Sequence, residues 1–244
     1  MGAPVPRPGI LDISPYVGGK SSLAGVARVI KLASNESALG PSPGAIEAYK
    51  EAAGRLHRYP DGGADALRAA LGEAHGLDPA RLVCGSGSDE LLDLLARAYA
   101  GPGDEVILPL PYYFNYQMWL AMQGISVVPL PFDDQTGGLP DPAMAAGLVT
   151  GKTKAVVLVT PNNPTGAEYP EATLNAFYDL AEAQGIALIT DETYKDFRTA
   201  SGTPHTLFQR DKWEDTFIHL YSFSKVYSLT GYRVGSITCG PRLM

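Results

Sequence analysis

After about residue 80, the apolar positions of the chain fall into short runs that alternate with amphipathic stretches. The run 155–159 reads Ala-Val-Val-Leu-Val, and an unbroken apolar run of this length is typical of a strand covered on both faces. In 89–99 and 170–184 the apolar residues recur at helical spacing instead. This alternation predicts an α/β domain with a seven-stranded, mainly parallel sheet and helices on both faces. The predicted strands are 81–84, 105–108, 126–130, 155–160, 187–190, 217–221 and 235–239.

The first 80 residues carry weaker patterns. Residues 1–40 are rich in proline and glycine, so we expect an extended arm that contributes to a small domain or to a dimer contact. Helices are predicted over 41–55 and 64–75, with a Pro-Asp-Gly-Gly turn at 60–63 between them. The expected division is therefore an arm, 1–40, followed by one large domain, 41–244.

Composition and charge narrow the class of protein. The chain has 244 residues, 45% of them hydrophobic, which is enough to bury a substantial core. Its net charge of −7 argues against nonspecific binding to nucleic acid or to an anionic membrane. No apolar run approaches the roughly 20 residues of a membrane span, and residues 1–8 lack a signal-peptide pattern, so we expect a cytoplasmic protein. The two cysteines and four histidines show no disulfide or metal-ligand spacing, and no metal is expected.

Lys225 is the most informative residue, because hydroxyls and a guanidinium lie near it in the sequence. It ends the segment Tyr-Ser-Phe-Ser-Lys at 221–225, and Arg233 follows in Gly-Tyr-Arg-Val-Gly. A lysine amine can form a Schiff base with an aldehyde. The hydroxyls of Ser222 and Ser224 can hold a phosphate together with Arg233, whose guanidinium makes charge-assisted bonds.

Two upstream segments supply groups suited to an aromatic ring. Asp191, in Thr-Asp-Glu-Thr-Tyr at 190–194, can pair with a protonated pyridine nitrogen and keep the ring an electron sink. The amide of Asn163 and the phenol of Tyr194 can hydrogen-bond a hydroxyl on the ring. Together with an amine and a phosphate site, these groups describe a site for pyridoxal 5'-phosphate (PLP).

The order and spacing of these motifs resemble those of the fold-type I PLP-dependent aminotransferases of class I/II. The shared pieces are Asn-Asn-Pro-Thr-Gly at 162–166, Asp-Glu-x-Tyr at 191–194, Ser-x-Ser-Lys at 222–225 and the arginine after it. The resemblance implies the large domain of that fold, with PLP bound to Lys225 near the end of the sheet. It also implies catalytic roles for Asp191 and Tyr194.

Two further segments have both a cofactor interpretation and a simpler structural one. Gly-Ser-Gly-Ser-Asp-Glu at 85–90 resembles the family's phosphate loop, which binds through the backbone amides of Ser88 and Asp89. The alternative is a plain helix start with Ser88 as the N-cap. In the aromatic stretch 112–116, the family pattern makes Tyr113 the residue that stacks on the ring. The alternative, that aromatic residues there only fill the core, is expected for at least two of the four.

The N-terminal half resembles the histidinol-phosphate aminotransferase branch, which implies histidine biosynthesis. Its Arg-Tyr-Pro segment is similar to residues 58–60, where the resemblance implies that Tyr59 reaches the cofactor phosphate of a neighbouring subunit in a homodimer. The stretch 32–43 resembles the branch's substrate entrance and makes Asn35 and Gly40 candidate substrate-binding residues, although Ser-Ala replaces Asn-Pro. Residues 16–20 are similar to its N-terminal arm. From about residue 108 onward, the motifs are closer to general class I aminotransferases for aspartate or aromatic amino acids.

The resemblance implies transamination between an amino acid, possibly histidinol phosphate as the first substrate, and a 2-oxo acid. Family members continue beyond the position of Met244 with the rest of a small domain, which carries an arginine for the substrate carboxylate. Two alternatives stay open. One is a PLP-dependent decarboxylase or lyase of the same fold, and the other is a catalytically inactive fragment that binds PLP or a partner chain.

Overall fold

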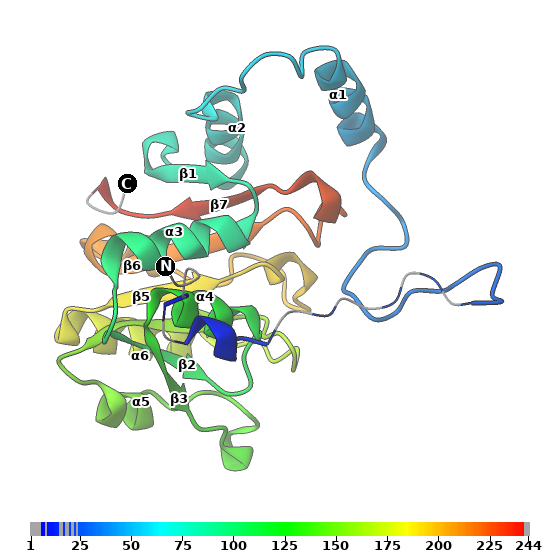
Figure 1. The fold of residues 1–244 in the computed structure, drawn as a ribbon. Helices are drawn as coiled ribbons and strands as arrows, with labels where there is room; N and C mark the ends of the chain where they lie inside the picture. The colour runs from blue at the N-terminus through cyan, green and yellow to red at the C-terminus, as the bar shows by residue number, and fades with distance from the viewer. Residues whose placement is uncertain are drawn as a thin grey trace, which may run out of the picture.

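A seven-stranded sheet forms the centre of the protein in a computed structural model, which describes residues 6–7, 9–14, 17, 20, 22 and 24–241 (Figure 1). The strand order is β1-β7-β6-β5-β4-β2-β3. Strand β7 runs antiparallel to β1 and β6, and the other neighbouring strands pair in parallel, so the predicted mainly parallel sheet is confirmed. The strands are β1 (Leu82–Gly85), β2 (Glu105–Pro109), β3 (Ser126–Leu130), β4 (Thr153–Val159), β5 (Ala187–Asp191), β6 (Phe217–Ser222) and β7 (Gly235–Thr238).

The helices include two that the amphipathic pattern does not predict, α4 and α5. In α4 the apolar residues are spread around the helix, and α5 is a short helix that begins at the N-cap Asp141, whose carboxylate accepts the Ala143 N–H at 2.8 Å. The four predicted helices are present with ends shifted by one or two residues. The helices are α1 (Pro43–Ala53), α2 (Asp65–His75), α3 (Ser88–Tyr99), α4 (Asn115–Gln123), α5 (Pro142–Leu148) and α6 (Glu171–Gln184).

Two separate apolar clusters cover the two faces of the sheet. Side chains alternate along a strand, so Val157 and Ile189 face one way while Val156 and Leu188 face the other. On the first face the strands pack against α3 and α4, and on the second face they pack against α5 and α6. Because both faces are covered, β4 is buried at nearly every position, as its continuous apolar run predicts.

The N-terminal region lies along the outside of this core. Residues 24–42 contain no helix or strand and run as a long connection to α1, which has no buried residue (Figure 1). The described part of 1–40 thus fits the expected extended arm, apart from a single 3-10 turn at Ile10–Asp12. Of the arm segment 16–20, Tyr16, Gly18 and Gly19 lie outside the described residues. The division at residue 40 stays a prediction.

The topology brings distant segments together at one edge of the sheet. In a parallel sheet the carboxyl ends of all strands lie at the same edge, and ligand sites of open α/β folds are found there. The segments that follow β1, β2, β4, β5 and β6 contain residues predicted from the sequence to form the site, which are Ser88, Asp89, Tyr113, Asn163, Tyr194, Ser224 and Lys225.

Candidate cofactor site

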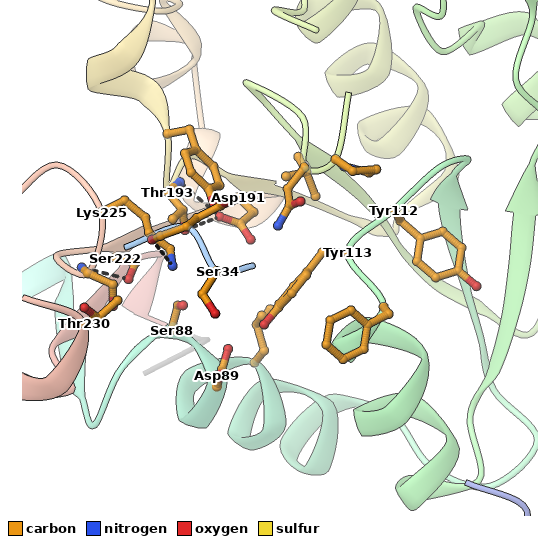
Figure 2. A pocket seen from close by; sticks show the side chains of 18 of the residues that line it. Ser34, Ser88, Asp89, Tyr112, Tyr113, Asp191, Thr193, Ser222, Lys225 and Thr230 are labelled. Atoms are coloured by element: carbon orange, nitrogen blue, oxygen red, sulfur yellow. Dashed lines mark hydrogen bonds between the residues drawn. The ribbon is translucent and has the colours of Figure 1, made fainter. Parts of the chain in front are cut away.

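A cavity of about 410 Å³ opens at this edge of the sheet (Figure 2). This volume is in the range of small-molecule sites. All the site residues predicted from the sequence line it, except Tyr59 and Gly40. The lining predicted residues are Asn35, Ser88, Asp89, Tyr113, Asn163, Asp191, Tyr194, Ser222, Ser224, Lys225 and Arg233.

Lys225 presents its amine at the wall of this cavity. It follows β6, and its Nζ donates a hydrogen bond to the backbone oxygen of Asn35, 3.0 Å away (Figure 2). Burial lowers the pKa of Lys225, and Arg233 lowers it further, while Glu36 and Asp89 oppose the shift. A lowered pKa increases the fraction of uncharged amine, which is the nucleophilic form.

Asp191 is the most firmly held polar group of the site. Its Oδ1 accepts the backbone N–H of Thr193 at 3.0 Å and the Thr193 hydroxyl at 2.7 Å, and its Oδ2 accepts the Tyr116 hydroxyl at 2.8 Å. Burial raises the pKa of Asp191, and these hydrogen bonds, with the charge of His219, oppose the rise. The carboxylate is therefore fixed in orientation from two elements, β5 and α4.

Two neighbouring asparagines have different roles after β4. Asn162 builds the turn, because its Oδ1 accepts the N–H and hydroxyl of Thr165 at 3.1 and 2.9 Å. Asn163 lines the cavity instead. Across from it, the hydroxyl of Tyr194 accepts a hydrogen bond from the Asn35 side chain at 2.7 Å. Burial raises the pKa of Tyr194, so its phenol stays protonated at neutral pH.

The start of α3 lies at one end of the cavity. Gly87, not Ser88, is the N-cap, and no side chain caps the helix, so the N-cap alternative for Ser88 is wrong. The amides of the first turn, including those of Ser88 and Asp89, therefore face the cavity edge at the positive end of the helix. Arg233 lies beside them, with its Nη2 3.7 Å from Oδ2 of Asp89.

Close packing of neighbouring protein atoms explains why two positions around the start of α3 are glycines. Gly87 has φ +93°, and a Cβ there would lie 2.5 Å from Nη2 of Arg233. A Cβ on Gly235 would lie 2.5 Å from the backbone nitrogen of Ser88, so β7 passes directly against the helix start. Ser222 and Ser224 are buried and line the cavity, and Figure 2 shows Ser222 near Lys225.

Aromatic side chains form the remaining wall. Tyr112, Tyr113 and Phe114 line the cavity together with Trp119 from α4, and Figure 2 shows the ring of Tyr113 between Asp89 and Asp191. The Tyr113 hydroxyl accepts a hydrogen bond from the Asn115 amide at 2.7 Å, which fixes the ring. Tyr116 is the buried member of this stretch.

Two predicted site residues lie elsewhere in this chain. Tyr59 is fully exposed, and Gly40 adopts φ +73° in a turn of the arm. Their roles toward a neighbouring subunit and toward substrate stay predictions. Conversely, the sequence analysis misses Tyr116 and Thr193. Tyr116 follows Tyr113 by three residues, a spacing that brings side chains together on a helix. Thr193 follows Asp191 by two residues, which is the spacing of an Asx turn.

The histidines are closer in space than their separation in sequence predicts. Nε2 of His205 lies 2.6 Å from Oε1 of Glu192, and Nε2 of His219 lies 3.3 Å from Oε2 of the same carboxylate. Within the described ranges, no group of three or more histidine, cysteine, aspartate or glutamate side chains is arranged to hold a metal ion. Within the same ranges, no helix is long and apolar enough to span a bilayer.

The donor set of the cavity fits PLP. An amine with a lowered pKa, a buried carboxylate, an amide, a phenol and a flat aromatic wall surround one space of suitable size. Hydroxyls, a guanidinium and a helix N-terminus meet at one end of it, a combination of groups suited to an anion.

Comparison with known proteins identifies the family. The model for "Aminotransferase class I and II" matches residues 27–244. The chain is 46% identical over 239 residues to a histidinol-phosphate aminotransferase of Paramagnetospirillum magneticum, covering 98% of this chain and 64% of that protein. It is 45% identical over 232 residues to the same enzyme of Rhodospirillum rubrum, covering 95% and 61%. The likeness to this branch therefore extends through both halves of the chain.

Solved structures show the same fold. Histidinol-phosphate aminotransferase from Sinorhizobium meliloti, in complex with PLP, matches with a TM-score of 0.76 at 28% identity, covering 86% of this chain and 56% of that one. A variant of Thermus thermophilus aspartate aminotransferase also matches with a TM-score of 0.76, at 27% identity, covering 86% and 59%. The chain thus spans less than two thirds of the length of these relatives. On the family match and the sequence identity, the chain belongs to the class I and II aminotransferases.

Proposed function

We propose that this chain supplies the PLP-binding part of an aminotransferase that transfers the amino group of histidinol phosphate to a 2-oxo acid. The observation that carries the proposal is the convergence of Lys225, Asp191 and the start of α3 on one cavity. The identity to histidinol-phosphate aminotransferases over nearly the whole chain supports the choice of amino donor.

When bound, PLP supplies an aldehyde and a ring that withdraws electrons from the reacting carbon. The chain's residues would orient it: Asp191 would accept a hydrogen bond from the protonated ring nitrogen, while Asn163 and Tyr194 would hydrogen-bond the ring oxygen. Tyr113 would stack on the ring face.

Lys225 has two functions in this proposal. Its uncharged amine would hold the aldehyde carbon of PLP, with loss of water, and when freed from the cofactor the same Nζ would serve as the base for the proton on the substrate carbon. The lowered pKa of Lys225 favours both, because both require the unprotonated amine. The hydrogen bond to the Asn35 backbone holds Nζ at the wall of the cavity.

The phosphate end of PLP is held by charge and by backbone amides. The first turn of α3, Arg233, Ser222 and Ser224 surround the position we assign to it. Tyr59, fully exposed here, is proposed to reach the phosphate of a second copy, so that the working unit is a homodimer in the cytoplasm.

The test is a visible absorbance spectrum of the purified chain with PLP, taken before and after addition of histidinol phosphate. Lys225→Ala serves as the control. A lysine-dependent band that the amine shifts supports a transaminase half-reaction. Release of carbon dioxide or of elimination products would favour a decarboxylase or lyase, and a band that no amine shifts would leave a PLP-binding fragment. Absence of any band in folded protein would refute the proposal.

A further inference from the structure

A buried polar cluster lies directly behind the cofactor site and takes no part in the chemistry proposed above. Glu192 and His205 have side chains that are 2% exposed, and the side chain of His219 is 9% exposed. Glu192 is held at three points: by His205 at 2.6 Å, by the Thr190 hydroxyl at 3.1 Å, and by His219 at 3.3 Å. These contacts come from three segments: β5, β6 and the loop that contains His205.

The hydrogen-bond pattern assigns the tautomer of His205. Its Nδ1 accepts the backbone N–H of Leu207 at 3.2 Å, so the proton of the neutral ring sits on Nε2 and is donated to Glu192. Burial alone would raise the pKa of Glu192, but the charge of His219 and the hydrogen bonds of both histidines outweigh it and hold the pKa well below its usual range. Glu192 is therefore a buried carboxylate, stabilised by its partners.

Packing alone does not require a carboxylate at this position. Placing an ion in the interior costs several kcal/mol, and an apolar residue of similar volume fills such a site without that cost. Glu192 faces the apolar side of the sheet that contains Leu188 and Phe217. Polar side chains, among them Lys195, Ser236 and Thr238, line the same small cavity as Glu192, but its hydrogen bonds are made within the cluster, so we look for the reason for its charge in what the cluster holds in place.

Glu192 directly follows Asp191 in the chain, so the two residues share a peptide bond. Because side chains alternate along a strand, Asp191 faces the cavity while Glu192 faces the opposite side. Asp191 is also bonded to Thr193, the residue after Glu192. Segment 191–193 begins at the last residue of β5 and is held to β6 by the Glu192 N–H, which donates to the Leu220 oxygen at 2.9 Å. The Glu192 side chain adds a second anchor on one face of this segment, and Asp191 lies on the other. Loss of the Glu192 side-chain contacts removes that anchor, so the direction of the Asp191 carboxylate is then less firmly fixed.

We propose that Glu192, held by His205, is a positioning residue that aims the Asp191 carboxylate at the ring nitrogen of the cofactor. The inference rests on the proposed function, because it concerns the same ring. Its action is mechanical, so a neutral side chain with the same hydrogen bonds should replace the carboxylate. Glutamine meets this condition, since its Oε1 accepts the proton of His205 and its amide donates to His219.

The test compares Glu192→Leu, which removes the hydrogen bonds, with Glu192→Gln, which keeps them. Equilibrium dialysis measures the affinity for PLP, and competition by inorganic phosphate reports separately on the anion end. Leu207→Ala, a fully buried residue beside His205, is the control for a loss of stability alone. His205→Phe, in a pocket already lined by Phe208 and Phe217, is the second variant if Glu192→Leu does not fold.

We expect Glu192→Leu or His205→Phe to lose about tenfold in PLP affinity, the scale of one misplaced polar contact, with competition by phosphate unchanged. Glu192→Gln should restore PLP affinity to within about threefold of the original. In an Asp191→Ala background the Glu192→Leu change should have no further effect on PLP affinity, because the carboxylate that Glu192 positions is then absent.

Two results would overturn the inference while the proposed function stands. In the first, Glu192→Leu and His205→Phe bind PLP with the same affinity as Leu207→Ala. In the second, Glu192→Leu loses PLP binding and phosphate binding to the same extent, which indicates general disruption of the site. Failure of the unmodified chain to bind PLP at all would instead remove the proposed function, and the inference with it.

Discussion

Replacing Tyr116 with phenylalanine tests whether the Asp191 carboxylate is held by a buried charged hydrogen bond. The change deletes one hydroxyl, which donates to Oδ2 of Asp191 at 2.8 Å, and keeps the ring that packs edge-on against Trp119 at 5.6 Å. A hydrogen bond to a charged group contributes about 1.5–3 kcal/mol to stability. We expect Tyr116→Phe to lower the free energy of unfolding by about 2 kcal/mol, or the melting temperature by about 4–8 °C for a chain of this size.

The pH dependence of this loss follows from the pKa of Asp191. Burial raises that pKa and the Tyr116 bond opposes the rise, so Tyr116→Phe raises it further. A carboxyl whose folded-state pKa is raised is unfavourable in its ionised form, and its contribution to stability falls as the pH rises through that pKa. The hydroxyl matters only while Asp191 is ionised. The destabilisation should therefore be larger at pH 8 than at pH 5.

Urea unfolding followed by circular dichroism, without cofactor, measures both effects. Tyr169→Phe is the matched control, because Tyr169 is also buried but its hydroxyl accepts a neutral hydrogen bond, from Asn162 at 3.4 Å. The control should cost less than about 1 kcal/mol and show little dependence on pH. A loss in Tyr116→Phe no larger than in Tyr169→Phe, or one that is the same at both pH values, would refute the reasoning.

Four further substitutions test other parts of the site. Glu192→Gln should make the stability depend less on pH in the acid range. The lowered pKa of Glu192 stabilises the fold above the unfolded-state pKa of about 4.3, and this stability is lost as the pH falls further. An unchanged dependence of stability on pH below pH 5 would contradict this expectation. Gly87→Ala should cost about 1–2 kcal/mol in urea unfolding, because φ is +93° and the new methyl meets Arg233. Arg233→Lys should weaken competition by inorganic phosphate about tenfold, and equal competition would argue against a bidentate contact. Lys225→Ala should abolish the visible band with PLP while retaining competition by phosphate, and a remaining band would refute the assignment of Lys225.

The sheet and the local motifs could be predicted from sequence because each depends on neighbours along the chain. The unbroken apolar run of β4 and the helical spacing in α6 reflect burial directly. In the same way the cavity contains Lys225 and Asp191, which stand in short motifs. Of the two helices that were not predicted, α4 packs against both the sheet and the aromatic wall of the cavity, so its apolar residues do not form one stripe.

Contacts between distant residues could not be read from the sequence. The bond between Tyr116 and Asp191 joins residues 75 apart, and the approach of His205 to Glu192 depends on how one loop folds beneath β5. The histidines are far apart in the sequence and were therefore predicted to be isolated, but the fold brings His205 and His219 together on the Glu192 carboxylate. Tyr59 illustrates a different limit, because its predicted contact lies on a second copy of the chain.

The hydrogen bond between Lys225 and the backbone of Asn35 has a consequence for synthesis of the protein, because its two residues are 190 positions apart. Chains grow at roughly 5–20 residues per second, so the arm waits about 10–40 s on the ribosome before its partner is made. Ile30 and Leu32 remain largely exposed even in the finished chain, at 76% and 87%. The arm thus exposes these two apolar side chains both before and after Lys225 is made, and exposed apolar surface is where chaperones bind and neighbouring chains associate.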